Sequence, residues 1–88
     1  MVRSYYQASS RGDCATADKL ATEEFAATDA CENRRPVSLR ATRVESRAGD
    51  RAVVQVDVDP GALSRWSDSV HLVREAGEWR ISAIDINV

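Results

Sequence analysis

The sequence predicts an α+β fold in which two or three N-terminal helices pack on one face of a curved, four-stranded antiparallel sheet. Helical spacing of apolar residues is confined to the first third of the chain, whereas the remainder alternates between apolar and polar residues. Turn residues divide that remainder into four segments. Helices followed by strands favour the α+β class, and 88 residues provide one domain, 1–88.

Composition excludes several classes of function. The chain is 43% hydrophobic and 30% charged, which is typical of a folded domain. Its net charge of -2 offers no basic footprint, so we expect no nucleic-acid partner. There is no apolar run of about 20 residues and no motif for a nucleotide, a metal or another cofactor.

The first helix is expected over residues 2–10. Its inward face has i, i+3, i+4, i+7 spacing and contains Val2, Tyr5, Tyr6 and Ser9. Gly12 suits the position just after a helix. No capping residue precedes Val2, so we expect the natural protein to continue upstream, through a signal or a membrane anchor.

The next helical stretch has two possible forms. Asp13 can cap a helix over residues 14–21, and Thr22 can cap a third helix that follows it. The alternative is one unbroken helix from 14 to 30, because no Gly or Pro interrupts that stretch.

The two cysteines distinguish these forms. In an unbroken helix, Cys14 and Cys31 would lie about 25 Å apart, whereas a disulfide requires Cα atoms within about 7 Å. We favour a bridge, which requires the chain to reverse near Thr22 and contributes about 3 kcal/mol. Two free, buried thiols are the alternative.

Four strands are expected downstream. The first begins at Pro36 and alternates through Leu39, but its apolar phase slips near Thr42, which indicates a bulge. The second, 52–59, follows the turn at residues 48–50. Its inward residues are Ala52, Val54, Val56 and Val58.

A hairpin at residues 65–88 supplies the last two strands. A break at Pro60 and Gly61 precedes it, and residues 75–78 form its turn. Its inward residues include Val70, Leu72 and Ile81. We expect Trp66 and Trp79 to be core aromatics, and the last strand also slips in phase after residue 83.

Two stretches resemble the nuclear-transport-factor-2-like, or cystatin-like roll, superfamily. They are YYQASSRGDC at the end of the first helix and the terminal hairpin pattern LVREAGEWRI, residues 72–81. The chain resembles most the small extracytoplasmic or lipoprotein-like versions from high-GC Gram-positive bacteria, and eleven Arg against one Lys fits that origin.

This resemblance implies a cone-shaped roll that works as a non-enzymatic binding or accessory domain of a secreted or membrane-anchored protein. Its partner would be an unknown protein or a small hydrophobic ligand. The family also includes ketosteroid isomerases and polyketide cyclases, which implies an enzyme with a small cone pocket as an alternative. Family sheets commonly pack face to face, so a homodimerisation module is another.

Four residues are candidates for chemistry. Asp68 lies on the inward face of its strand, either in the concavity, where it could accept a proton, or at an exposed sheet edge; we favour the edge. His71 falls on the opposite face, where we expect it to be solvated, and a general base is the alternative. Tyr5 and Tyr6 could donate to an oxyanion, as in isomerase-like relatives, but we expect them in the core.

Overall fold

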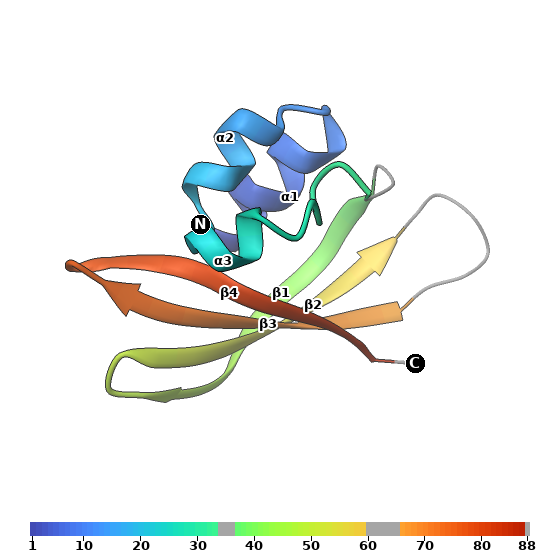
Figure 1. The fold of residues 1–88 in the computed structure, drawn as a ribbon. Coiled ribbons are helices and arrows are strands. Elements are labelled where there is room, and N and C mark those ends of the chain that lie inside the picture. Colours follow the sequence, from blue (N-terminus) through green and yellow to red (C-terminus); the bar gives the residue numbers. More distant parts are fainter. Residues whose placement is uncertain (34–36, 60–65, 88) are drawn as a thin grey trace.

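Three short helices precede a four-stranded antiparallel sheet, which confirms the predicted α+β class (Figure 1). The computed structural model describes residues 1–33, 37–59 and 66–87. The elements are α1 (Val2–Ser10), α2 (Cys14–Lys19), α3 (Glu23–Ala26), β1 (Ser38–Ala48), β2 (Arg51–Asp59), β3 (Trp66–Glu75) and β4 (Glu78–Asn87). The predicted strand start at Pro36 and the break at Pro60 and Gly61 lie outside the described residues.

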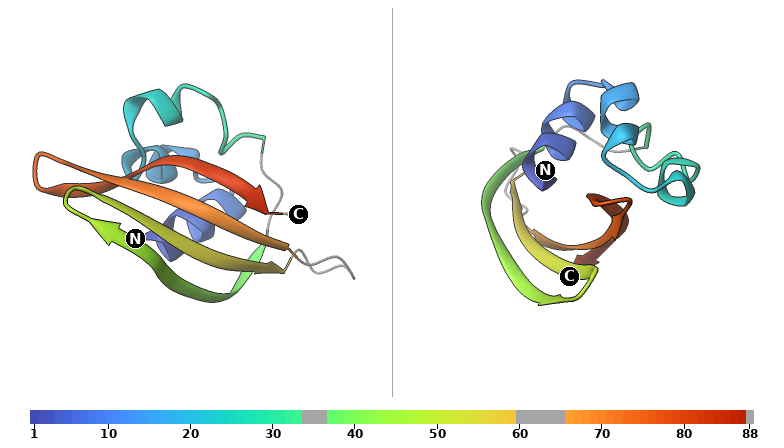
Figure 2. Two further views of the ribbon diagram at one scale, coloured as in Figure 1. Left: turned by 90° about the horizontal axis from the view of Figure 1, so that it is seen from below. Right: turned by 90° about the vertical axis from the view of Figure 1, so that its left-hand side faces the viewer.

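The sheet has the simplest order, β1-β2-β3-β4, because each strand pairs with the next one along the chain. It is strongly curved, and the three helices lie across its concave side (Figure 2). One face of the sheet is thus covered, whereas none of the helices in the described residues lies on the convex face (Figure 2).

The helix boundaries follow the predicted caps. Gly12, just after α1, has a φ of +75, a conformation that glycine adopts without a steric cost. Asp13 accepts a hydrogen bond from the Thr16 backbone N–H at 3.3 Å, and Thr22 accepts one from the Phe25 N–H at 3.1 Å. Two separate helices therefore occupy this stretch, and the unbroken helix from 14 to 30 is wrong.

Helix α2 ends at Lys19, two residues before the predicted end, because the chain leaves it to pair with β4. The Thr22 N–H donates to the Ile81 carbonyl and the Ile81 N–H donates to the Leu20 carbonyl, both at 2.9 Å. The reversal brings Cys14 to Cys31, which form a disulfide with Cα atoms 5.7 Å apart.

Both predicted phase slips are bulges. In β1 the pairing register with β2 shifts between Leu39 and Ala41 and again between Val44 and Ser46. Between β3 and β4 it shifts where His71 pairs with Ala83 and the next residue, Leu72, pairs with Ile81. Bulges bend the strands that contain them, in keeping with the curvature of the sheet.

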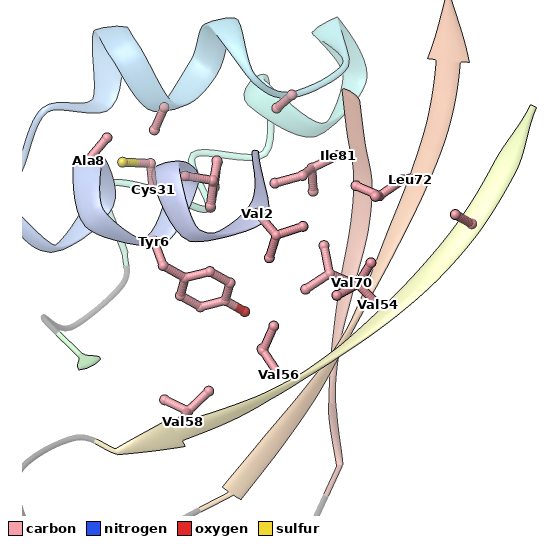
Figure 3. Close-up of a cluster of buried hydrophobic side chains, with 14 residues drawn as sticks. Val2, Tyr6, Ala8, Cys31, Val54, Val56, Val58, Val70, Leu72 and Ile81 are labelled. Atoms are coloured by element: carbon pink, nitrogen blue, oxygen red, sulfur yellow. The ribbon is translucent and has the colours of Figure 1, made fainter. Parts of the chain in front are cut away.

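The core lies between the helices and the concave face. Its large hydrophobic members that are at most 1% exposed are Tyr5, Tyr6, Val56, Val58, Val70 and Ile81. Figure 3 shows the valines of β2 and β3 directed toward α1. Burial of one such aliphatic side chain contributes about 1.5–3 kcal/mol, so this face holds the domain together.

Strand β1 departs from this pattern. Every residue from Arg40 to Ala48 is exposed, and Val44 is 66% exposed. Trp66 and Trp79, predicted as core aromatics, are only half-buried. The helical layer is too short to cover the whole concave face, so the far part of β1 remains open.

Candidate functional site

Tyr6 and Asp68 form a hydrogen bond inside the concave face. The Tyr6 phenol on α1 donates to Asp68 Oδ2 on β3 at 2.5 Å. Tyr6 is 1% exposed and Asp68 is 0% exposed, and Figure 3 shows the Tyr6 ring pointing from α1 toward the sheet. A hydroxyl bonded to a carboxylate makes a short, strong contact. The pair therefore helps to fix α1 across the sheet.

The exposed edge position favoured for Asp68 is wrong. Strand β3 is internal to the sheet, so Asp68 has Val56 on one side and Ile86 on the other. Alternation along the strand correctly assigned it to the inward face, but the sequence did not reveal that α1 lies above it. Burial of a carboxylate demands polar partners, and Tyr6 supplies one.

Tyr5 lies beside this pair but faces the other helices. Its ring is edge-on to Tyr6, with centroids 6.0 Å apart, and 6.2 Å from the Phe25 ring of α3. Edge-to-face contacts of this kind add to the area that the rings bury. At 1% exposure Tyr5 belongs to the core, where it connects α1 to α3.

His71 lies on the opposite face of the sheet from Asp68. Its Nε2 is 2.8 Å from Asp85 Oδ2, and the two side chains are 39% and 68% exposed. Exposed polar contacts of this kind compete with water and contribute little. The structure thus brings Asp68 together with Tyr6 but separates both from His71.

A small apolar cleft of about 190 Å³ opens at the hairpin end of the concave face. All four strands contribute to it, as does the residue before α1. Its lining residues are Met1, Val44, Arg47, Ala52, Val54, Leu72 and Trp79. The strand register assembles it, because Val44 lies opposite Val54 and Ala52 lies opposite Leu72.

Trp79 packs against the margin of the core and lines this cleft. The guanidinium carbons of Arg47 and Arg74 are 5.4 and 5.5 Å from its ring centroid, and exposed contacts of this kind contribute about 0.5–1 kcal/mol each. Arg74 is also bonded to Asp50 at 2.8 Å. Among the described residues Arg47 makes no ion pair, so the cleft combines an apolar floor with a cation at its rim.

Sequence reasoning missed Val44, Arg47 and Trp79 as possible site residues. One signal was present: the phase slip in the first strand left Val44 without a place in the predicted core. Nothing in the sequence pointed to Arg47, because its approach to Trp79 depends on the pairing of four strands.

Two larger clefts are mainly polar. One of about 490 Å³ lies between α1 and the start of β1, and its lining includes Arg3, Arg11 and one side of Tyr6. The other, of about 430 Å³, includes Glu23, Glu24 and Glu75. Exposed charges of this kind are typical of a solvated surface, so neither cleft defines a site.

Within residues 1–33, 37–59 and 66–87, no three His, Cys, Asp or Glu side chains gather as a metal site would require. No helix in this described part combines the length and apolarity needed to cross a bilayer. No protein-family model matches the sequence, and no curated protein shows a significant match. Any function must therefore be inferred from the geometry of the chain.

Proposed function

We propose that this chain is a non-enzymatic binding or accessory domain of a secreted or membrane-anchored bacterial protein. The observation that carries the proposal is the burial of Asp68 beneath Tyr6, at 0% and 1% exposure. The carboxylate best placed for acid–base chemistry on the concave face is thereby closed off from a substrate. The mainly apolar opening on that face is instead the cleft around Val44.

An isomerase- or cyclase-like enzyme is the alternative. It would need Asp68 as a base and Tyr6 as a hydrogen-bond donor, both within reach of a substrate. Around Asp68 the space between α1 and the sheet is instead filled by Val56, Val58 and Val70, each at most 1% exposed, and the cleft that Tyr6 lines opens farther along, between α1 and β1. Catalysis would therefore require α1 to move away from the sheet.

The proposed fold is a small cone-shaped roll of the nuclear-transport-factor-2-like kind. The curved sheet and the helices on its concave side support it. The disulfide between Cys14 and Cys31 supports a location outside the cytoplasm, because structural disulfides persist in oxidising compartments.

The cleft suits a small apolar group. Its volume of about 190 Å³ is roughly six times that of a water molecule in the liquid, which matches one large apolar side chain or the end of a hydrophobic ligand. Arg47 at the rim would favour a ligand that also carries a negative charge.

A titration with 1-anilinonaphthalene-8-sulfonate, an apolar anionic probe, tests this function. In ¹⁵N-resolved NMR spectra we expect saturable shifts at the amides of Val44 and Ala52 and at the Trp79 indole. The Val44→Asp variant should bind about tenfold more weakly, because it places a charge in the apolar floor. Val73→Asp, which adds the same charge at a strand valine outside the cleft and opposite Arg51 and Arg80, is the matched control. Equal affinity in all three proteins, or no saturation, would contradict a binding cleft.

Nitration with tetranitromethane tests the enzyme alternative. Tyr5 and Tyr6 are the two tyrosines of the chain, and their burial predicts no modification of the folded protein and two modifications in urea. Modification of Tyr6 in the folded protein would mean that solvent reaches Asp68, and would favour the enzyme instead.

A further inference from the structure

We propose that the open edge of β1 accepts an extended segment of a partner protein, in which apolar residues alternate with acidic ones. This inference rests on the proposed binding function and specifies the class of partner. Three features of β1 carry it: its free backbone edge, the position of its apolar side chains beside the cleft, and its positive charge.

The backbone of β1 is open along one side. The strand runs for eleven residues and pairs with β2. Among the described residues, no backbone hydrogen bond joins it to any other element. An edge strand directs half of its N–H and C=O groups outward, where an added strand can pair with them.

The added strand would extend the apolar cleft. Val44 points to the concave side, since it lies opposite Val54, and it is 66% exposed. A new strand about 4.8 Å beyond β1 would place every second side chain on this side, beside Val44. Those residues of the partner must be apolar, because they would cover Val44 and the mouth of the cleft.

The charge of β1 defines the other half of the pattern. The strand carries Arg40, Arg43 and Arg47 and one acid, Glu45, so it has a net charge of +2 in a chain of net charge -2. Arg43 lies opposite Gln55 on the convex side and donates to its side chain at 3.0 Å, exposed to solvent. The alternate residues of the added strand would lie on this side, where acidic groups complement Arg43.

The same charges disfavour a second copy of this chain as the occupant. Two β1 strands placed side by side would bring together two segments of net charge +2, and like charges across adjacent strands are destabilising. Repulsion of its own copy and attraction of an acidic strand together give specificity.

Two synthetic peptides test the proposal: an acetylated, amidated nonapeptide that alternates valine with glutamate, and one that alternates valine with lysine. Calorimetry and NMR should show the glutamate peptide binding about tenfold more tightly at low salt, with shifts along residues 40–48. Its affinity should fall at 0.5 M salt, because exposed charges are then screened. Equal binding of both peptides, or shifts centred on the convex face or β4, would overturn the proposal.

Variants distinguish peptide binding at the edge of β1 from probe binding in the cleft. Arg43→Gln should weaken the glutamate peptide about three- to fivefold and leave the naphthalene probe unchanged, because Arg43 does not line the cleft. Ala41 and Thr42 are consecutive in a regular part of the register, so their N–H groups point in opposite directions. The residue of these two whose amide hydrogen exchanges fast has its N–H directed outward, and its replacement by proline should abolish peptide binding by removing that donor. The variant should still fold, because edge strands tolerate proline.

The outcomes distinguish this proposal from the binding function beneath it. If the probe binds the cleft but the glutamate peptide does not bind, the edge proposal is wrong and the binding function stands. If neither binds, both are wrong. A solution mass near twice 9.7 kDa that returns to the monomer value in the edge proline variant would assign the edge to a second copy and overturn the proposal.

Discussion

The strands β4 and β1 form the two edges of one sheet and differ in what lies against them. The backbone of β4 bonds outward to the segment Leu20–Thr22, which forms a parallel bridge between Ala21 and Ile81. In the described part of the chain, β1 has no comparable partner. The side chains of the two strands differ as well, because Ile81 on β4 is 0% exposed in the core, whereas Val44 on β1 is 66% exposed.

The difference follows from how the short helices are tied down. The disulfide joins the start of α2 to the chain beyond α3, and the segment between these two helices lies along β4. Helix α1 is held over the middle of the sheet by Tyr6 and Asp68. This domain therefore covers the edge at β4 with its own chain and leaves the edge at β1 exposed to solvent.

The largest expected effect compares matched residues of the two edge strands. Ile81→Ala should lower the free energy of unfolding by about 4 kcal/mol, because it leaves a cavity in a packed core. Val44→Ala should change it by less than about 0.5 kcal/mol, because the side chain is exposed. Urea unfolding of both variants provides the comparison. Equal losses would mean that β1 is covered in solution.

Removal of the disulfide should have the next largest effect. Replacement of both Cys14 and Cys31 by alanine should cost about 3 kcal/mol, because the unfolded chain gains freedom. The closed edge should loosen first, so hydrogen exchange at the amides of Thr22 and Ile81 should accelerate more than in β2. Uniform acceleration across the sheet would contradict a specific role in closing β4.

Thr22 is a smaller test of the same edge. Thr22→Ala should cost about 1 kcal/mol, because the side chain caps α3 by accepting from the Phe25 N–H. Thr22→Ser keeps the hydroxyl and should retain most of the stability. Urea midpoints measure both variants, and a loss in the serine variant as large as in alanine would assign the effect to the methyl group instead.

The smallest effect concerns pH. Hydrogen bonds from Thr16 hold the pKa of Asp13 below its ordinary value of 3.8, with further help from Arg11 and Lys19. Since the pKa is lower in the folded state, the stabilisation is present above pH 3.8 and is lost as the pH falls through the folded value.

The variant Asp13→Asn provides the control for this pH effect, because asparagine caps helices without titrating. Its stability should therefore depend less on pH below about 4 than that of the natural chain. NMR titration of Asp13 should give a pKa under 3.8. A value at or above 3.8 would contradict the capping bond.

Much of the fold could be predicted from local pattern. The caps Asp13 and Thr22 and the inward valines of β2 depend on neighbours within a few residues, where helical and strand periodicities act. The cysteine spacing excluded a bridge across a straight helix, so a bridge and a chain reversal had to occur together. The bulge in β1 was visible because a change of phase in a strand must be absorbed somewhere.

The candidate site was less predictable. Tyr6 and Asp68 are 62 residues apart, and their contact depends on where α1 crosses the sheet. Trp79 was predicted to be a core residue because its side chain is large and mostly apolar. Its position at the end of a hairpin leaves it half-buried beside Arg47.

By itself the sequence determined the α+β class, the order of helices before four strands, most of their inward faces and the bulged first strand, because these depend on short-range periodicity and turn chemistry. Only the tertiary structure decided that Asp68 is buried beneath Tyr6 and that Val44 remains exposed. The physical reason is that the helices cover only part of the concave face of the sheet. Which part of the concave face is filled depends on how far three short helices reach over four strands.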